Sequence, residues 1–219
     1  MATIKTIAIV GATGNMGSAI ARALSTSSNY RLLLMSNDQD KLLDLRLALE
    51  KSGSEVYALS CAKEASWEAD IIIVATPYEA EKEVAEKIRE VGTGKIVISI
   101  SNPLNSAYSD LVTTPDTSAA EELQKLLPNS KVVKAFNTTF AADFVTPVID
   151  GKTADAFIAG NNSDAVETVS ALVKTAGFNP IVAGDLTVSR TLERMQLLLI
   201  QLTMKYNYNW LAGWKILHR

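Results

Sequence analysis

The chain has 219 residues, and 47% of them are hydrophobic, which is ample for one α/β domain with a buried core. Its formal net charge of −3 argues against a nucleic-acid-binding protein, which would normally carry a basic stripe. The single cysteine, Cys61, excludes a disulfide framework and a zinc site built on paired cysteines.

The sequence shows neither a targeting segment nor a membrane-spanning segment. The opening residues MATIKT indicate the start of a first strand, so we expect no signal peptide. No apolar stretch reaches the roughly 18 residues that a transmembrane helix requires. We therefore expect a soluble, cytoplasmic protein that has no membrane partner.

A strand, a glycine-rich turn and a helix are predicted at the N-terminus. The apolar run at residues 7–10 has the length of a buried strand, and Gly11, Gly14 and Gly17 follow at three-residue intervals. In dinucleotide-binding turns of this kind, the first glycine allows the tight turn and the second lets the pyrophosphate approach the backbone. The third lets the helix pack closely on the strand. The stretch therefore predicts a dinucleotide site at the helix N-terminus.

Strands and helices are predicted to alternate along the rest of the chain. The predicted strands cover residues 30–35, 56–59, 69–76, 95–100, 131–135, 156–159 and 180–182. The predicted helices run from the turn at 36–38 to about 52, from 78 to about 91, over 118–127 and 163–176, and from about 188 towards 211. This alternation predicts an α/β fold of the Rossmann type, with a doubly wound, mostly parallel sheet.

No linker interrupts the chain, so we expect residues 1–219 to form a single NAD(P)-binding Rossmann domain. Residues 147–219 would be a C-terminal extension that ends in a long helix. Ligands of doubly wound sheets lie beyond the carboxyl ends of the strands, where the strand order switches. This rule predicts one crevice that is lined by residues 11–17, 36–37, 76–78, 100–105 and 136–140.

The second predicted strand ends where such proteins recognise the ribose of the cofactor. NAD-preferring proteins usually carry Asp or Glu there, whereas this chain has Ser36 and Asn37, with Lys41 further along. A hydroxyl, an amide and a cation suit a 2′-phosphate, which a carboxylate would repel, so these residues favour NADP. Asp38 and Asp40 count against this preference, and capping of the next helix is an alternative role for Ser36 and Asp38.

Acid–base machinery is not recognisable, and we assign no catalytic residue and no metal ligand. The only histidine, His218, stands next to the C-terminus, where an exposed tail is expected. Tyr78 and Lys82 form the Y-x-x-x-K pattern of short-chain dehydrogenases, but they lie too early in the chain, so the spacing is attributed to chance. A nucleotide site without a proton donor favours hydride transfer between two cofactors, which depends on proximity and orientation.

Three segments together resemble one family. They are GATGNMG at 11–17 with the turn from Ser36 to Lys41, VVKAFNTT at 132–139, and the C-terminal run at 184–217. This set is similar to the NADP oxidoreductases that depend on coenzyme F-420, a deazaflavin. The second segment also resembles the cytosolic oxidoreductase domains of the six-transmembrane metalloreductases. The resemblance spans nearly the whole chain.

The resemblance implies an NADP-dependent oxidoreductase that passes hydride between NADP(H) and a deazaflavin or flavin-type acceptor, and it implies a homodimer. It assigns the 2′-phosphate to Thr13, Ser36 and Lys41, and the pyrophosphate to Asn15 and Met16. The ribose and nicotinamide would lie along residues 76–78, and the hydride-transfer region would be bordered by residues 101–103 and 137. The complete set of expected cofactor-binding residues is Gly11, Thr13, Gly14, Asn15, Met16, Gly17, Ser36, Asn37, Lys41, Ala75, Thr76, Pro77, Tyr78, Ser101, Asn102, Pro103 and Asn137.

The chain departs from the family pattern at two places. Asn37 stands where the family commonly has an arginine, and the loop SISNPLNS at 99–106 is more polar than the family's valine- and proline-containing segment. Two alternative functions therefore stay open. One is a dinucleotide-binding sensor without catalysis, and the other is a reductase of a small carbonyl or imine.

Overall fold

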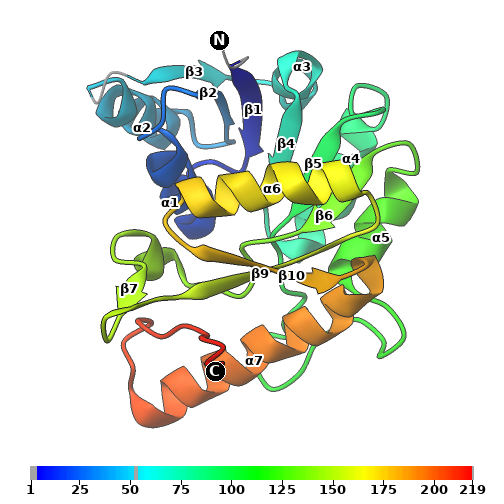
Figure 1. Cartoon of the computed structure of the whole chain (residues 1–219). Coiled ribbons are helices and arrows are strands. Elements are labelled where there is room, and N and C mark those ends of the chain that lie inside the picture. The colour runs from blue at the N-terminus through cyan, green and yellow to red at the C-terminus, as the bar shows by residue number, and fades with distance from the viewer. Residues whose placement is uncertain (1–3, 52–53, 219) are drawn as a thin grey trace.

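A central eight-stranded sheet organises the computed structural model, which describes residues 4–51 and 54–218 (Figure 1). The strand order is β10-β9-β6-β5-β4-β1-β2-β3, and every neighbouring pair is parallel except β6 and β9. The strands are β1 (Lys5–Val10), β2 (Tyr30–Met35), β3 (Glu55–Leu59), β4 (Ile71–Val74), β5 (Ile96–Ser99), β6 (Lys131–Lys134), β9 (Asp155–Gly160) and β10 (Asn179–Gly184). The predicted Rossmann-type, mostly parallel sheet is confirmed.

Helices cover both faces of this sheet, as the alternation of strands and helices requires. One hydrophobic cluster joins the sheet to α1 (Asn15–Leu24), α2 (Gln39–Glu50) and α6 (Ser163–Thr175). A second cluster joins the opposite face to α3 (Ala62–Glu68), α4 (Tyr78–Ile88) and α5 (Ala119–Leu126). Side chains of β1 alternate between the two clusters, so this strand is buried on both sides.

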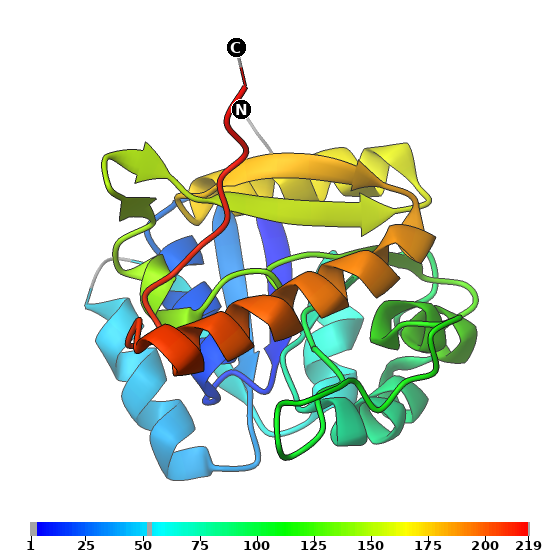
Figure 2. The same ribbon diagram turned by 90° about the horizontal axis from the view of Figure 1, so that it is seen from below.

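The last helix, α7 (Ser189–Tyr206), packs at the carboxyl end of β6, and Figure 2 shows it crossing in front of the sheet. It also contacts the irregular loop that follows β5, because Gln201 Nε2 donates to the carbonyl of Tyr108 at 3.1 Å. The chain then turns back along β9, where the Asp155 N–H donates to the Trp214 carbonyl at 2.8 Å. Strands β9 and β10, which precede α7 in the chain, belong to the same sheet as β1.

Some predicted boundaries and elements need correction. The final helix ends at Tyr206 rather than near 211, because Asn207 adopts a left-handed conformation with φ of 55° and caps it. The elements that were not predicted from the sequence are α3, the hairpin of β7 (Val148–Ile149) and β8 (Lys152–Thr153), and two short 3-10 helices, η1 (Ala141–Phe144) and η2 (Leu186–Val188). The expected end of the second helix at Ser52 lies outside the described residues.

Candidate functional site

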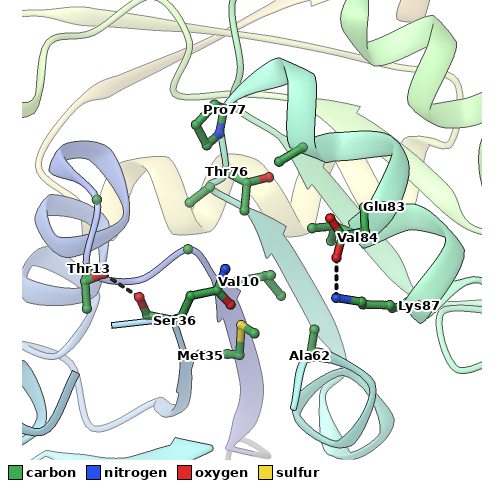
Figure 3. A pocket seen from close by; sticks show the side chains of 15 residues that line it. Val10, Thr13, Met35, Ser36, Ala62, Thr76, Pro77, Glu83, Val84 and Lys87 are labelled. Carbon is green, nitrogen blue, oxygen red and sulfur yellow. Dashed lines mark hydrogen bonds and ion pairs between the residues drawn. The ribbon is translucent and has the colours of Figure 1, made fainter. Parts of the chain in front are cut away.

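A cavity of about 250 Å³ opens at the carboxyl ends of β1, β2 and β4 (Figure 3). In the sheet, β1 lies between β2 and β4, so the cavity lies where the strand order switches. Three of the predicted segments meet here, namely the glycine turn, the end of β2 and the turn after β4. The lining residues are Val10, Gly11, Thr13, Gly14, Met35, Ser36, Asn37, Ala62, Ala75, Thr76, Pro77, Ala80, Glu83, Val84 and Lys87.

The three glycines of the turn have different structural roles. Gly11 has φ of +91°, and a Cβ there would lie 2.5 Å from the Ala75 carbonyl oxygen. A Cβ on Gly17 would lie 2.2 Å from the Gly11 carbonyl oxygen, so this glycine allows α1 to pack against the turn. A Cβ on Gly14 would meet nothing closer than 3.4 Å. Gly14 is therefore the one whose substitution reaches the cavity without disturbing the backbone.

The N-terminus of α1 offers backbone donors beside the cavity that have no acceptor within the helix. Its N-cap is Gly14, and the first intrahelical bond runs from the Ser18 N–H to the Gly14 carbonyl at 2.9 Å. The N–H groups of Asn15, Met16 and Gly17 therefore precede the first intrahelical donor and have no acceptor within the helix. Together with the helix dipole, they form a local electrostatic environment that favours an anion such as a pyrophosphate.

A polar pair that joins the glycine turn to the end of β2 faces the cavity. The hydroxyls of Thr13 and Ser36 are hydrogen-bonded to each other, as Figure 3 shows, and the Ser36 hydroxyl also accepts from the Asp38 N–H at 3.2 Å. The capping role expected in this turn belongs to Asp38, whose carboxylate accepts from the Lys41 N–H at 3.1 Å. The Thr13 and Ser36 hydroxyls are therefore fixed at the cavity wall, where they are placed to contact a ligand.

Lys41 is directed to Asp38 rather than to the cavity. Its Nζ lies 2.8 Å from Asp38 Oδ2, and Lys41 is not among the lining residues. The hydrogen bond from Lys41 lowers the pKa of Asp38, and the same contact raises the pKa of Lys41. In this structure the cation that lines the cavity is Lys87 of α4, which is paired with Glu83 at 2.6 Å (Figure 3). Lys87 was not predicted as a site residue, since Glu and Lys at this spacing are typical of an exposed helix face.

The expected single crevice is only partly formed, because the predicted residues at the ends of β5 and β6 do not line this cavity. They form a separate polar cluster further along the sheet. Asn102 Nδ2 donates to the Asn137 carbonyl at 3.0 Å, and Asn137 Nδ2 donates to Asn102 Oδ1 at 3.0 Å. The reason for the separation is the strand order, because β5 and β6 lie one and two strands beyond β4. Tyr78, Asn15, Met16, Gly17 and Lys41 also lie outside the lining.

A buried ion pair lies behind the polar loop after β5. Lys134, the last residue of β6, and Glu193 of α7 are both 0% exposed, and their Nζ and Oε1 atoms are 2.7 Å apart. Lys134 Nζ also donates to the Ser101 carbonyl, and Glu193 Oε2 accepts from the Ala119 N–H at 3.2 Å. A charge this deeply buried needs such partners, because its transfer from water is costly. The pair therefore connects β6, α5 and α7 to the loop.

Glu81 of α4 belongs to the same buried region. It is 3% exposed, and its Oε1 has no hydrogen-bond partner among the described residues. Burial raises the pKa of Glu81 to about 7, although the charge of Lys134 opposes this shift. Tyr78, on the same helix, donates its hydroxyl to Glu122 Oε2 at 2.5 Å, not to Lys82. This contact agrees with a chance origin for the Y-x-x-x-K spacing.

The raised pKa makes the stability of the fold depend on pH. The protonated form of Glu81 stabilises the fold fully at pH values below the usual pKa of 4.5. This stabilisation is lost as the pH rises through 7. A pKa difference of this size between the folded and unfolded states corresponds to about 3 kcal/mol of unfolding free energy. We expect Glu81→Gln to remove most of this loss when the unfolding free energy is measured in urea between pH 4.5 and 8. Glu79→Gln, an exposed change on the same helix, is the matched control, and an unchanged pH slope in Glu81→Gln would contradict the assignment.

Comparisons with known proteins give the family. Residues 6–103 match the family model described as NADP oxidoreductase coenzyme F420-dependent. The F420-dependent NADP reductase of Methanocaldococcus jannaschii is 33% identical over 213 residues, which cover 91% of this chain and 93% of that protein. The chain belongs to this family. The family model covers β1 to β5 and thus every element that lines the cavity.

Two further proteins show how far the family likeness extends. A crystal structure assigned to an F420-dependent NADP reductase of Arthrobacter sp. FB24 has a TM-score of 0.84 and 26% identity, and it covers 98% of this chain and 100% of its own. Metalloreductase STEAP3 of Rattus norvegicus is 34% identical over 107 residues, which cover 49% of this chain and 21% of that protein. Both resemblances inferred from the sequence are thereby confirmed.

Across residues 4–51 and 54–218, no helix combines the length and the apolar character needed to cross a lipid bilayer. Over the same residues, no group of three or more His, Cys, Asp or Glu side chains is arranged to hold a metal ion.

Proposed function

We propose that this protein transfers hydride between NADP(H) and coenzyme F420, a deazaflavin, or a flavin-type acceptor. The observation that carries the proposal is the cavity at the switch in strand order, where a glycine turn and the N-terminus of α1 meet two fixed hydroxyls. This is the chemistry that a phosphorylated dinucleotide needs. The curated relatives, which are named F420-dependent NADP reductases, support the acceptor.

The adenosine half of NADP(H) would occupy the cavity. Thr13, Ser36 and Asn37 would contact the 2′-phosphate, and the donors at the N-terminus of α1 would hold the pyrophosphate. Lys41 would reach the 2′-phosphate by leaving Asp38, because an exposed ion pair of this kind is weak and exchanges readily for another partner. The chain beyond β4, at residues 75–78, would follow the ribose and the nicotinamide.

The nicotinamide half would lie towards the ends of β5 and β6. Ser101, Asn102, Pro103 and Asn137 would border the region of hydride transfer. No side chain is proposed as a proton donor, because direct hydride transfer between two rings requires proximity and alignment rather than acid–base groups. The residues of this region would therefore act by orienting the two rings and excluding water.

Asn37→Arg is expected to tighten NADPH binding about tenfold, because an arginine beside Ser36 would add a charge-assisted contact to the 2′-phosphate. The affinity for NADH should stay unchanged, since NADH lacks that phosphate. Calorimetric titration of both nucleotides measures the effect, with Asn37→Gln as an uncharged control of similar reach. Equal gains for NADPH and NADH would show that the 2′-phosphate binds elsewhere.

The acceptor is tested by following NADPH oxidation with coenzyme F420, with a flavin, and with no added acceptor. We expect turnover with the deazaflavin and none without an acceptor. Turnover with a small imine or carbonyl alone would favour the reductase alternative, which the comparisons do not support. Tight NADPH binding without any turnover would favour the sensor alternative.

We also propose that the protein is a homodimer and that residues 1–219 form one domain. Large apolar side chains are exposed on α7 and the following tail, namely Leu198, Met204, Tyr206, Trp210 and Leu211, and such a surface supports an interface between copies. The participation of β9 and β10 in the main sheet supports the single domain. Sedimentation measures the oligomeric state, and a monomer would contradict the first part. The cytoplasmic location stays a prediction.

A further inference from the structure

The ammonium of Lys134, which is buried behind the loop after β5, has no part in the proposed contacts with NADP(H). Lys134 Nζ has two partners there, Glu193 Oε1 and the carbonyl of Ser101. Because the ammonium is completely buried, bulk solvent does not reach it to replace either partner. The Ser101 carbonyl is therefore held at a fixed position relative to β6 and α7.

The position of Ser101 determines where its neighbour Asn102 lies. Asn102 forms two hydrogen bonds with Asn137, one to its carbonyl and one from its side-chain amide. Asn137 is only 1% exposed, so this pair forms a rigid contact between the chain after β5 and the chain after β6. A shift of the Ser101 carbonyl would therefore move the edge of the site where the nicotinamide is expected.

Resting on the proposed function, we propose that Lys134 and Glu193 are positioning residues for the nicotinamide half of the site, and that Glu81 makes their arrangement sensitive to pH. Lys134 acts through the Ser101 carbonyl, and Glu193 couples this action to α7. Neither residue touches the dinucleotide.

Glu81 supplies the proton-dependent step. Its carboxyl is only 3% exposed, and Oε1 has no hydrogen-bond partner among the described residues, so an ionised Glu81 would need a counter-charge. The groups that act on this carboxyl electrostatically or by hydrogen bonding are Lys134 of β6, Glu193 of α7, Glu122 of α5 and the Ser101 hydroxyl of the loop. While Glu81 is protonated, Lys134 is shared only by Glu193 and the Ser101 carbonyl. Once Glu81 is ionised, a second carboxylate competes for the same ammonium and weakens its bond to the carbonyl. Hydride transfer should therefore slow as the pH rises through about 7.

The double variant Lys134→Met/Glu193→Leu tests the positioning role, because it removes both buried charges and leaves neither unpaired. We expect its NADPH affinity to stay within about twofold of the wild type, since the cavity at β1 is untouched. The turnover number with the deazaflavin should fall at least about tenfold, with little change in KM for the deazaflavin. A wild-type turnover number in the folded double variant would overturn the proposal.

The fluorescence of bound NADPH tests the same role without any acceptor, because the emission comes from the nicotinamide. In the wild type we expect this emission to change in one step near pH 7, and we expect Glu81→Gln and the double variant to lack the step. Glu79→Gln is the control that keeps it. A step that persists in Glu81→Gln would overturn the pH role. This measurement needs only NADPH, so it tests the positioning role even if the deazaflavin proves not to be the acceptor.

Discussion

Gly14→Val is expected to abolish NADPH binding while the protein stays folded. Gly14 lines the cavity at the N-cap of α1, and a Cβ there meets no atom closer than 3.4 Å, so the backbone accommodates a side chain. The added methyl groups would occupy the space in which the pyrophosphate approaches the helix N-terminus. Calorimetry should show affinity lower by at least about a hundredfold, and thermal unfolding should show a melting temperature within a few degrees of the wild type.

Gly17→Val is the contrasting variant, because its side chain would collide with the backbone and not with the ligand. The Cβ would lie 2.2 Å from the Gly11 carbonyl oxygen, so we expect loss of the folded state. The two variants thus separate the binding role of one glycine from the packing role of another. Wild-type NADPH affinity in Gly14→Val would contradict the placement of the pyrophosphate.

Lys134→Met is expected to cost about 3–5 kcal/mol of unfolding free energy, because it leaves Glu193 buried without a counter-charge. Both side chains are 0% exposed, so the Glu193 carboxylate would not be solvated by bulk water in place of the ammonium. Since whole domains are stable by only about 5–15 kcal/mol, this loss takes a large part of the total. Urea denaturation of the single variant at pH 7 measures it.

Lys134→Met/Glu193→Leu is the matched control for this loss. Removing both charges should restore most of the stability, although the Ser101 carbonyl and the Ala119 N–H each lose a partner at about 1 kcal/mol. A double variant that is no more stable than Lys134→Met would show that the ion pair is not the source of the cost.

The elements of the fold could be predicted where their signal is local. The apolar runs of β1, β2 and β4 are continuous because these strands are buried on both faces. Helix α3 was missed because its seven residues bury only small side chains and give little periodicity. The predicted end of α7 lay too far along the chain, because apolar side chains continue beyond Tyr206. The helix is ended by the left-handed conformation of the single residue Asn207.

The candidate site also has a part that could be predicted from the sequence and a part that could not. The glycine turn and the turn after β2 are each a short continuous segment of the sequence, so their chemistry could be recognised without a structure. Lys134 and Glu193 are 59 residues apart, and charged side chains are normally expected at the surface. Glu81 likewise lies on a helix rich in charged residues, where no pattern distinguishes a buried carboxyl. Only the packing of α7 against the sheet reveals this cluster.

Calorimetric titration of the wild-type protein with NADPH and, separately, with NADH tests the central claim most directly. The claim is that the cavity at the switch in strand order binds a dinucleotide through the glycine turn and recognises its 2′-phosphate through Thr13 and Ser36. We expect NADPH to bind at least about tenfold more tightly than NADH, as a charge-assisted contact to the phosphate predicts. Equal affinities would contradict the recognition of the 2′-phosphate, and a lack of binding by either nucleotide would contradict the oxidoreductase function itself.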